Sequence, residues 1–247
     1  MDNLRTLFYN HTGKRIHKWD HYFEIYERYL EKYKGKDIAI LEIGVAHGGS
    51  MQLWKKYFGK NVKIFGIDVN PECKKLEEDN VQIFIGSQSD ASFLESVAKK
   101  LPPLDVIIDD GGHTMKQQIV SFEILHKYLK DDGVYICEDT HTSYWYEYRG
   151  GLRKKGTFIE YAKNIVDNIN AWHVKDSSEV KPDTITATIN SVHFYDSIVV
   201  FEKIKNREKP FHLIKGVDTI QAFQEPDIRM GKGIAGKVRS LLRKLRK

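Results

Sequence analysis

Residues 106–113 read Val-Ile-Ile-Asp-Asp-Gly-Gly-His, and residues 135–141 read Tyr-Ile-Cys-Glu-Asp-Thr-His. Each stretch is a short apolar run that favours a β-strand and ends in two adjacent carboxylates. In a parallel α/β sheet both carboxylate pairs emerge at the carboxyl edge, where such sheets bind ligands. Four acids at one edge repel one another unless a cation or a proton lies between them. Because carboxylate oxygens suit a hard divalent ion such as Mg²⁺, Mn²⁺ or Ca²⁺, the pattern predicts a metal site.

A histidine, His113, stands three residues after the second acid of the first stretch. Histidine is the side chain whose ordinary pKa lies near neutral pH, so it can act as a base beside a metal. His141 is the rival for that role, although a substrate-positioning or structural role is favoured for it. The two stretches together predict a metal site with a base next to it.

The stretch 38–58 has the pattern of the first unit of a nucleotide-binding fold. A buried strand, residues 38–44, runs into the loop Val-Ala-His-Gly-Gly-Ser and then into a helix with apolar residues at 51, 53, 54, 57 and 58. Glycines in such a loop let the backbone approach a ligand and direct the N-terminus of a helix toward it. A dinucleotide-binding fingerprint requires glycine at position 46, where this chain has Ala46, which argues against NAD.

Acidic and polar residues follow the next two predicted strands. The strand 62–68 ends in Asp68, 24 residues after Gly44, where an acid is placed to accept hydrogen bonds from ribose hydroxyls. The strand 81–86 is followed by Ser-Gln-Ser-Asp, with Gln88 in second place. This loop is placed to border an adenine ring, or to cap a helix that starts at Ala91, and both roles are compatible.

The remaining pattern predicts an α/β fold of the Rossmann type. Further strands are expected at 104–109 and 134–138, and alternation with helices at 16–33, 115–129 and 158–172 implies a parallel sheet. Two more strands, 184–189 and 193–203, are expected to form an antiparallel hairpin that turns at Asn190-Ser191. Residues 1–14 are predicted to form a loose N-terminal segment without regular secondary structure. Residues 141–157, with Tyr144 and Trp145, are read as a substrate lip.

The charge of the chain is concentrated in its last residues. The 247-residue chain has a net charge of +5, with 39 basic and 34 acidic residues. Residues 231–247 contain seven of these basic residues and no acid, so the rest of the chain carries 32 basic residues against 34 acids. A body without excess positive charge argues against a nucleic-acid partner.

The basic tail has the spacing of an amphipathic helix. Its apolar residues, at 234, 238, 241, 242 and 245, fall on one helical face, and basic residues occupy much of the rest. This predicts peripheral contact with an anionic membrane surface. A terminal helix packed on the domain or on a second subunit is equally compatible with the pattern.

Cysteine usage and hydropathy predict the compartment. The two cysteines, Cys73 and Cys137, lack metal-ligand spacing, and no apolar run has the length of a membrane span. The start of the chain is polar and does not resemble a signal peptide. We therefore expect a cytoplasmic protein with reduced thiols, located at the inner face of the membrane if the tail binds lipid. Three segments are expected: residues 1–35 at the N-terminus, a central domain of residues 36–204 and an extension of residues 205–247.

The motifs together resemble those of class I S-adenosylmethionine-dependent methyltransferases. The resemblance rests on the five-strand core with its C-terminal hairpin, on Glu42-x-Gly44-x-x-x-Gly48 and on Asp68. The two acid motifs, with the sequence Thr-Ser-Tyr-Trp at 142–145, make it narrower. They look like the metal-dependent sugar O-methyltransferases of macrolide biosynthesis, of the mycinamicin and macrocin type. This resemblance covers roughly residues 12–203.

The resemblance implies roles for individual residues and for two cofactors. It implies a divalent ion, Mg²⁺ or Mn²⁺, held by Asp110, Glu138 and Asp139, with His113 as the general base. It implies S-adenosylmethionine and a sugar acceptor, and the predicted substrate residues for that acceptor are His141, Tyr144 and Trp145. The cofactor would be bound by Glu42, Gly44, Gly48, Ser50, Asp68, Gln88 and Asp109.

The chain departs from the family pattern at three points. Gly112 stands where the family commonly has serine, and Ser87 stands where it has aspartate, which makes the adenine contact less secure. The long N-terminal extension of some members is missing, so a homo-oligomer is left open. Two other functions remain as alternatives: a nicotinamide-dependent oxidoreductase, and a cofactor-binding scaffold without catalytic activity.

Overall fold

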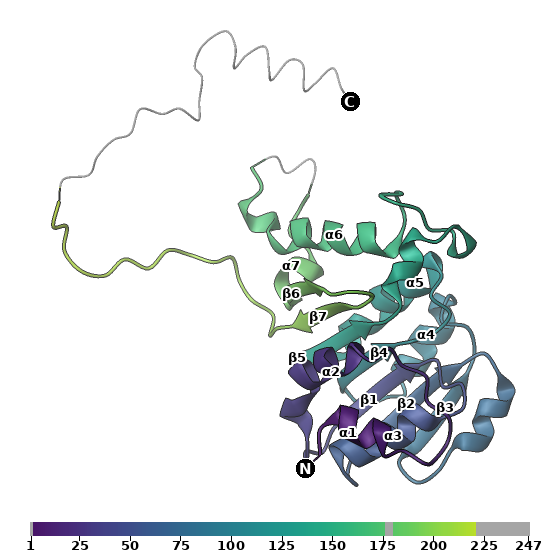
Figure 1. Ribbon diagram of the computed structural model, residues 1–247. Coiled ribbons are helices and arrows are strands. Elements are labelled where there is room, and N and C mark those ends of the chain that lie inside the picture. Colours follow the sequence, from purple (N-terminus) through teal and green to yellow (C-terminus); the bar gives the residue numbers. More distant parts are fainter. Residues whose placement is uncertain (1, 176–179, 221–247) are drawn as a thin grey trace. The chain divides into compact units, whose positions relative to one another are not determined.

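The computed structural model describes residues 2–175 and 180–220, and the chain divides into two units at Lys209 and Pro210. Within the described residues of the first unit, seven strands form one sheet in the order β3-β2-β1-β4-β5-β7-β6 (Figure 1). Strands β1 to β5 are parallel, and β7 is antiparallel to both β5 and β6. The expected Rossmann-like α/β fold with a C-terminal antiparallel pair is confirmed.

The elements alternate along the chain as far as β5. The strands are β1 (Ala39–Ile43), β2 (Lys63–Asp68), β3 (Val81–Ile85), β4 (Leu104–Asp109), β5 (Leu129–Cys137), β6 (Ile189–Phe194) and β7 (Val199–Lys203). The α-helices are α1 (Leu4–Tyr9), α2 (Tyr22–Leu30), α3 (Gly49–Phe58), α4 (Ala91–Ala98), α5 (Met115–Leu125), α6 (Phe158–Ile169) and α7 (Thr184–Thr188). Short 3₁₀ helices lie at Glu31–Tyr33, Pro71–Leu76, His126–Tyr128, Thr140–Tyr144, Tyr146–Tyr148 and Ala171–His173.

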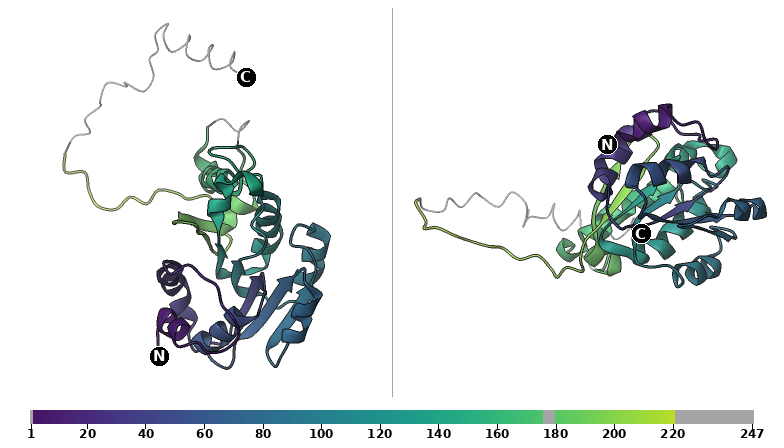
Figure 2. Two further views of the ribbon diagram at one scale, coloured as in Figure 1. Left: turned by 45° about the vertical axis from the view of Figure 1, so that its right-hand side comes forward. Right: turned by 90° about the horizontal axis from the view of Figure 1, so that it is seen from below.

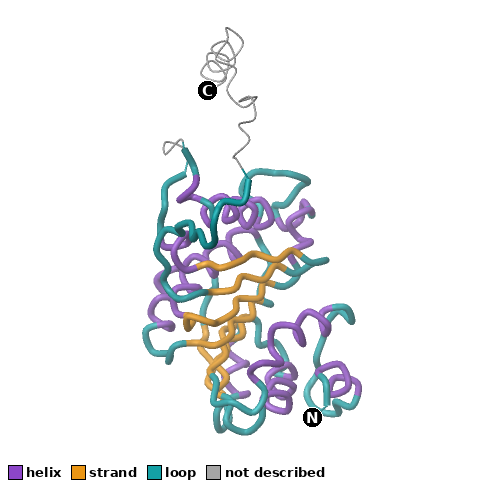
Figure 3. The backbone as a smooth tube through the Cα atoms, turned by 90° about the vertical axis from the view of Figure 1, so that its left-hand side faces the viewer, coloured by secondary structure: helices purple, strands orange, loops and turns teal. Residues whose placement is uncertain are grey.

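Helices cover both faces of the sheet, as the views in Figures 2 and 3 show. On one face α1, α2 and α3 pack on strand residues such as Ile40, Ile108 and Val200. On the other face α4, α5 and α6 pack on residues such as Leu41 and Phe201. Alternate strand residues therefore enter two separate cores, which is why β1 and β4 are apolar almost throughout.

The C-terminal part of the sheet differs from the sequence prediction. Residues 184–188 form the helix α7 instead of a strand, because Asp183 caps it through the backbone N–H of Thr186 and the Thr186 side chain caps Asp183 in return. The hairpin exists, but it turns at 195–198, between β6 and β7, and not at Asn190-Ser191. There Ser197 takes a left-handed backbone with φ +64°.

Three other element boundaries differ from those predicted from the sequence. Residues 1–14, expected to lack regular structure, contain the helix α1, whose first turn is capped by Asn3. The expected helix 16–33 begins only at Tyr22, so residues 10–21 form an irregular segment. Strand β5 begins at Leu129 and not at the expected position 134, and its pairing with β4 is irregular between Leu104 and Val106.

The second unit, from Pro210, has no regular element among its described residues, 210–220. The apolar side chains there are largely exposed, with Ile214 at 95%. The predicted basic helix 231–247 lies outside the described residues. No helix in the described part of the chain has the length and apolar character needed to cross a membrane.

Candidate active site

A pocket of about 390 Å³ opens at the carboxyl ends of β1, β2, β4 and β5. The loops after these strands and after β3 form most of its wall, and residues 15–19 of the N-terminal segment, Tyr22 and Gln117 also line it. The predicted site residues that line it are Gly44, Ser50, Asp68, Gln88, Asp110, His113, Glu138 and Asp139. The sheet edge expected from the two acid motifs is thus the edge that carries the pocket.

The loop after β1 passes very close to the loop after β4. Gly44 has φ +93°, and a Cβ atom added there would lie 2.0 Å from the backbone oxygen of Asp110. The backbone N–H of Asp110 donates to the carbonyl of Ile43 at 3.0 Å. Only glycine combines this backbone conformation with this contact, so Gly44 allows the loops after β1 and β4 to pack against each other. Gly48 is the N-cap of α3 with φ +73°, but it does not line the pocket.

Asp68, at the end of β2, fixes the shape of the same loop. One carboxylate oxygen accepts hydrogen bonds from the N–H groups of Val45 and Ala46, at 2.9 and 3.0 Å. The other oxygen accepts from the N–H of Asn70 at 2.8 Å. Asp68 also lines the pocket, so the predicted contact with ribose remains a prediction that its position allows.

Glu42 lies beneath the loop instead of in the pocket wall. Its carboxylate is fully buried and accepts hydrogen bonds from the Ser50 hydroxyl at 2.8 Å and from the Trp54 indole at 3.2 Å. Burial raises the pKa of Glu42 to about 7. Its position indicates that it supports α3 and Ser50 rather than contacting a ligand directly.

Gln88 lines the pocket, and Asp109 lies beneath it as a second support. The Gln88 amide donates to Asp109 at 2.9 Å, and its carbonyl oxygen accepts from the N–H of Gly112 at 2.7 Å. The other oxygen of Asp109 accepts from the Tyr135 hydroxyl at 3.0 Å. Burial raises the pKa of Asp109 to about 7. The resemblance predicts that Asp109 binds the cofactor, but its carboxylate faces these two donors and does not line the pocket.

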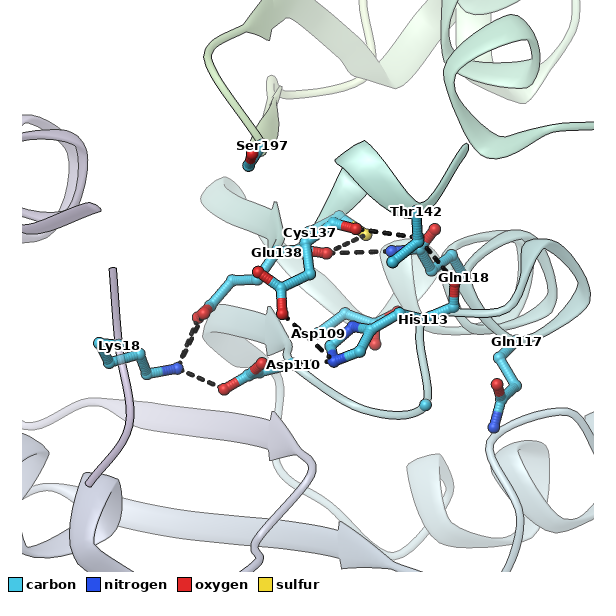
Figure 4. Close-up of polar contacts among 12 residues, drawn as sticks. Lys18, Asp109, Asp110, His113, Gln117, Gln118, Cys137, Glu138, Thr142 and Ser197 are labelled. Carbon is cyan, nitrogen blue, oxygen red and sulfur yellow. Dashed lines mark hydrogen bonds and ion pairs between the residues drawn. The ribbon is translucent and has the colours of Figure 1, made fainter. Parts of the chain in front are cut away.

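His113 meets two carboxylates at the other end of the pocket (Figure 4). Its Nε2 atom lies 3.5 Å from an oxygen of Asp139 and 3.8 Å from an oxygen of Asp110. One potential ligand atom from each of the three residues lies within 4.8 Å of the other two. This is a group of hard oxygens and an imidazole nitrogen that can hold a divalent ion.

Glu138, the third predicted metal ligand, is engaged elsewhere. Its side chain is 1% exposed and accepts hydrogen bonds from Lys18 at 2.9 Å and from the Tyr26 hydroxyl at 2.5 Å. Lys18 also donates to Asp110 at 2.5 Å. Burial and the nearby Asp110 raise the pKa of Glu138, while Lys18 opposes the shift. Figure 4 shows Lys18 reaching both carboxylates from the N-terminal segment.

His113 itself is largely buried, and burial lowers its pKa, although Asp110 and Asp139 oppose that shift. Its backbone carbonyl accepts from the Thr142 hydroxyl at 2.8 Å. Among the described residues its Nδ1 atom is buried without a hydrogen-bond partner. The imidazole is therefore favoured in its neutral form, in which a ring nitrogen can accept a proton.

Three non-glycine residues of the pocket wall have left-handed backbones. They are Ala46 with φ +48°, His113 with φ +56° and Asp139 with φ +52°. For residues other than glycine this conformation costs about 1–2 kcal/mol each. The surrounding fold therefore holds the wall of the pocket in a conformation that these residues would not adopt by themselves.

Comparison with known proteins agrees with this architecture. Residues 41–140 match the family model described as a methyltransferase domain. This region is similar to methyltransferase domains. It contains the glycine loop after β1, Asp68 and both acid motifs, so the resemblance to class I methyltransferases seen in the sequence is confirmed for the region that carries the pocket.

Two curated relatives share much of the chain. One is an 8-demethyl-8-(2-methoxy-alpha-L-rhamnosyl)-tetracenomycin-C 3'-O-methyltransferase of Streptomyces olivaceus, 30% identical over 88% of this chain and 58% of that protein. Another is the mycinamicin VI 2''-O-methyltransferase of Micromonospora griseorubida, 29% identical over 74% of this chain and 48% of that protein. The chain spans about half the length of the curated relatives it matches.

A solved structure has the same fold. The MycE methyltransferase of the mycinamycin pathway, in a complex with Mg and SAH, superposes with a TM-score of 0.77. It is 24% identical in sequence, and the match covers 97% of this chain and 60% of that one. At this identity the likeness shows the fold alone, and it extends beyond the methyltransferase domain to nearly the whole chain.

The predicted lip residues lie beside the pocket of the methyltransferase domain but do not line it. His141 contacts Trp145 edge-on, with ring centres 4.6 Å apart, and it contacts Trp19 at 6.0 Å. Trp19 does line the pocket and is half exposed. His141 is thus a link in an aromatic row that reaches the pocket mouth, while the Tyr144 side chain is 48% exposed.

Sequence reasoning allowed Tyr22 to border a pocket, as it does, but it missed the contribution of Lys18 and Tyr26 to the site. Lys18 and Tyr26 bond to Glu138, and the Tyr22 hydroxyl donates to Asp139 at 2.6 Å. The stripe of aromatic residues in α2 has the pattern of core packing, and its rings are indeed buried. A usable signal was present, because tyrosines four residues apart on a buried face need partners for their hydroxyl groups.

Proposed function

We propose that this protein is an O-methyltransferase that depends on S-adenosylmethionine and a divalent metal and methylates a sugar hydroxyl. The observation that carries the proposal is the convergence of Asp110, His113 and Asp139 at one end of a pocket whose other end is built by the glycine loop and Asp68. The methyltransferase domain supports it, as do the names of the relatives, which are O-methyltransferases of a rhamnosyl tetracenomycin and of mycinamicin VI.

The residues of the acid end fit a hard divalent ion. Asp110, Glu138 and Asp139 would hold it, because their oxygens are the ligands that Mg²⁺ and Mn²⁺ prefer. Three carboxylates in a largely buried space also need positive charge to offset their repulsion. When bound, the ion would lower the pKa of a hydroxyl that coordinates it.

The residues of the other end fit a nucleoside-bearing cofactor. The volume of about 390 Å³ lies within the range of small-molecule sites, roughly 300–1,000 Å³. Asp68 can accept hydrogen bonds from ribose hydroxyls, and the glycine at position 44 lets the backbone approach the ligand. S-adenosylmethionine would supply the methyl group, bound as a sulfonium.

His113 would take the proton of the acceptor hydroxyl. Its lowered pKa keeps the ring neutral near pH 7, so a nitrogen is free to accept. Asp110 and Asp139, at 3.8 and 3.5 Å from Nε2, would then stabilise the positive ring that results. Thr142 holds the backbone of His113 and so keeps the ring aimed at the acids.

The test is methyl transfer to candidate glycosides, read by mass spectrometry, before and after metal removal. We expect EDTA to abolish turnover and Mg²⁺ or Mn²⁺ to restore it. Turnover that persists in metal-free buffer would contradict the metal requirement. Titration with S-adenosylmethionine and with NADH tests the alternatives, because an oxidoreductase would bind NADH and a scaffold would bind cofactor without turnover.

We also infer that the acceptor belongs to a glycan or a glycosylated natural product, and that the protein works in the cytoplasm. Both cysteines of the chain are free and buried, which is compatible with a reducing compartment. Peripheral membrane contact through residues 231–247 is tested by sedimentation with anionic and neutral vesicles. Protein that ends at Met230 should lose the binding, and equal binding by both proteins would rule the contact out.

A further inference from the structure

Lys18 occupies an unusual position for a lysine. Its side chain is 2% exposed, and its ammonium contacts Asp110 Oδ2 at 2.5 Å and both oxygens of Glu138 at 2.9 Å. It reaches them from a segment without regular structure, across 92 and 120 positions of sequence. A buried ammonium needs such partners, because its desolvation is otherwise too costly.

The contacts of Lys18 use the oxygens that a metal ion would need. Both oxygens of Glu138 bond to the ammonium, and one of them also accepts from Tyr26. The two carboxylate oxygens of Asp110 have different neighbours: Oδ2 contacts Lys18 and Oδ1 faces His113. A divalent ion between Asp110 and Asp139 can therefore recruit Glu138 only if the ammonium gives up its place.

We propose that the Lys18 ammonium and the divalent ion compete for Asp110 and Glu138, so that metal entry displaces Lys18 from the acid cluster. The inference rests on the proposed metal site and adds a regulatory element to it. The lysine offsets part of the negative charge of the carboxylates in the metal-free protein and keeps Asp110 and Glu138 in place. It also lowers the apparent affinity for the metal, because only the fraction of molecules with a displaced lysine can use all three acids.

The displacement reaches the cofactor end of the pocket. Residues 15–19 line the pocket, and their two ends are anchored separately. At one end the backbone N–H of Lys14 donates to the Gln52 side chain in α3 at 2.8 Å. At the other end the carbonyl of Trp19 accepts from the N–H of Tyr22 at 3.1 Å. Movement of Lys18 between these anchors changes the pocket wall, so metal and cofactor affinity are coupled, each altering the other by the same factor.

The test is calorimetric titration of the full chain with Mn²⁺ alone, without cofactor or acceptor. Lys18→Met removes the ammonium and keeps much of the side-chain volume, and we expect it to bind Mn²⁺ roughly tenfold more tightly or better. The melting temperature of the metal-free variant should fall, and Mn²⁺ should raise it by more than in the unaltered protein. Lys18→Arg retains a cation and should keep the weaker affinity.

Lys74→Met is the matched control, because Lys74 is exposed and pairs with Glu77 away from the acid cluster. It should leave Mn²⁺ affinity unchanged. If Lys18→Met does not fold, Lys18→Gln, which removes the charge and retains a hydrogen-bond donor, takes its place with the same expected gain.

Equal or weaker Mn²⁺ binding by Lys18→Met and Lys18→Gln would overturn the competition while leaving the metal site itself intact. Failure of the unaltered protein and of all variants to bind Mn²⁺ would instead overturn the metal requirement of the proposed function, and the competition with it. The two failures are therefore distinguishable in one experiment.

Discussion

The two ends of the pocket are built in opposite ways. At the cofactor end, polar groups are satisfied by neighbours close in sequence or by the next loop, as when Asp68 accepts from the backbone of Val45 and Ala46. At the acid end, Asp110, Glu138 and Asp139 crowd together, and their hydrogen-bond donors come from the distant N-terminal segment. The polar groups of the cofactor end are therefore paired with one another, while the acid end retains negative charge that its donors do not fully offset.

This difference separates structural carboxylates from reactive ones. Asp109 and Asp110 are adjacent in sequence, yet Asp109 is fully buried with both oxygens bonded, and Asp110 lines the pocket. Side chains of successive residues at a strand end point to opposite sides, so one acid supports the fold and the other faces the ligand. Metal binding and catalysis are therefore expected at carboxylates whose negative charge is not fully offset by neighbouring groups.

The largest expected effect comes from removing the general base, His113, at the acid end of the pocket. His113→Ala should lower kcat by about 10²–10⁴-fold, because a general base is lost, while cofactor affinity changes little. Steady-state kinetics and a cofactor titration measure the two quantities. His141→Ala is the control, since His141 lies in the aromatic row outside the pocket. A large loss in His141→Ala with a small loss in His113→Ala would reverse the assignment.

The contact between the two ends is broken by Gly44→Ala. The new Cβ would lie 2.0 Å from the backbone oxygen of Asp110, so one of the loops must move. A displacement of this size can cost about 10²-fold in rate, and we expect weaker cofactor binding as well. Gly59→Ala is the matched control, because Gly59 has a similar φ of +97° but nothing within 4 Å of the added atom. Similar losses in both variants would show that backbone strain alone, and not the loop contact, matters.

The adjacent acids provide a sharper test. Asp109→Ala should lower the free energy of unfolding by roughly 2 kcal/mol, because the donors on Gln88 and Tyr135 lose their acceptor in the core. Asp110→Ala should remove metal binding at a smaller cost in stability, since repulsion among the acids falls. Denaturant unfolding and Mn²⁺ calorimetry separate the two effects. The distinction fails if Asp109→Ala weakens Mn²⁺ binding as strongly as Asp110→Ala does.

A histidine far from the acids gives the smallest effect. His126 is buried, its ring stacks on Phe122, and its Nδ1–H donates to the Phe122 carbonyl at 2.7 Å. Burial lowers the pKa of His126 to about 4. Below its unfolded pKa of about 6.5 the unfolded chain binds a proton that the folded chain rejects, so the stability present above pH 6.5 is lost as pH falls toward 4.

His126→Phe keeps the stacking and removes the titration, and the Phe122 carbonyl retains its backbone partner. Between pH 7 and pH 5 the variant should therefore lose roughly 1–2 kcal/mol less unfolding free energy than the unaltered protein. Denaturant unfolding across this range measures the difference. Parallel pH profiles for the two proteins would show that His126 does not titrate on unfolding in this range.

The features predictable from sequence are those with local causes. The ends of β4 and β5, the glycine loop and Asp68 follow from strand periodicity and from the parallel order, so the acids are expected at one edge. Lys18 could not be found this way, because its contacts span 92 and 120 positions and no local pattern marks them. The predicted hairpin is misplaced because the capping by Asp183 outweighs the β-propensity of the threonines that follow.

The left-handed backbones of Ala46, His113 and Asp139 have a consequence for protein engineering. Glycine relieves the strain of such a conformation, so Ala46→Gly is expected to stabilise the folded chain by more than the entropy that glycine adds to the unfolded one. At His113 and Asp139 the same change deletes the reactive side chain. Directed evolution that selects for heat resistance alone would therefore accumulate changes in the pocket wall and yield robust but inactive variants.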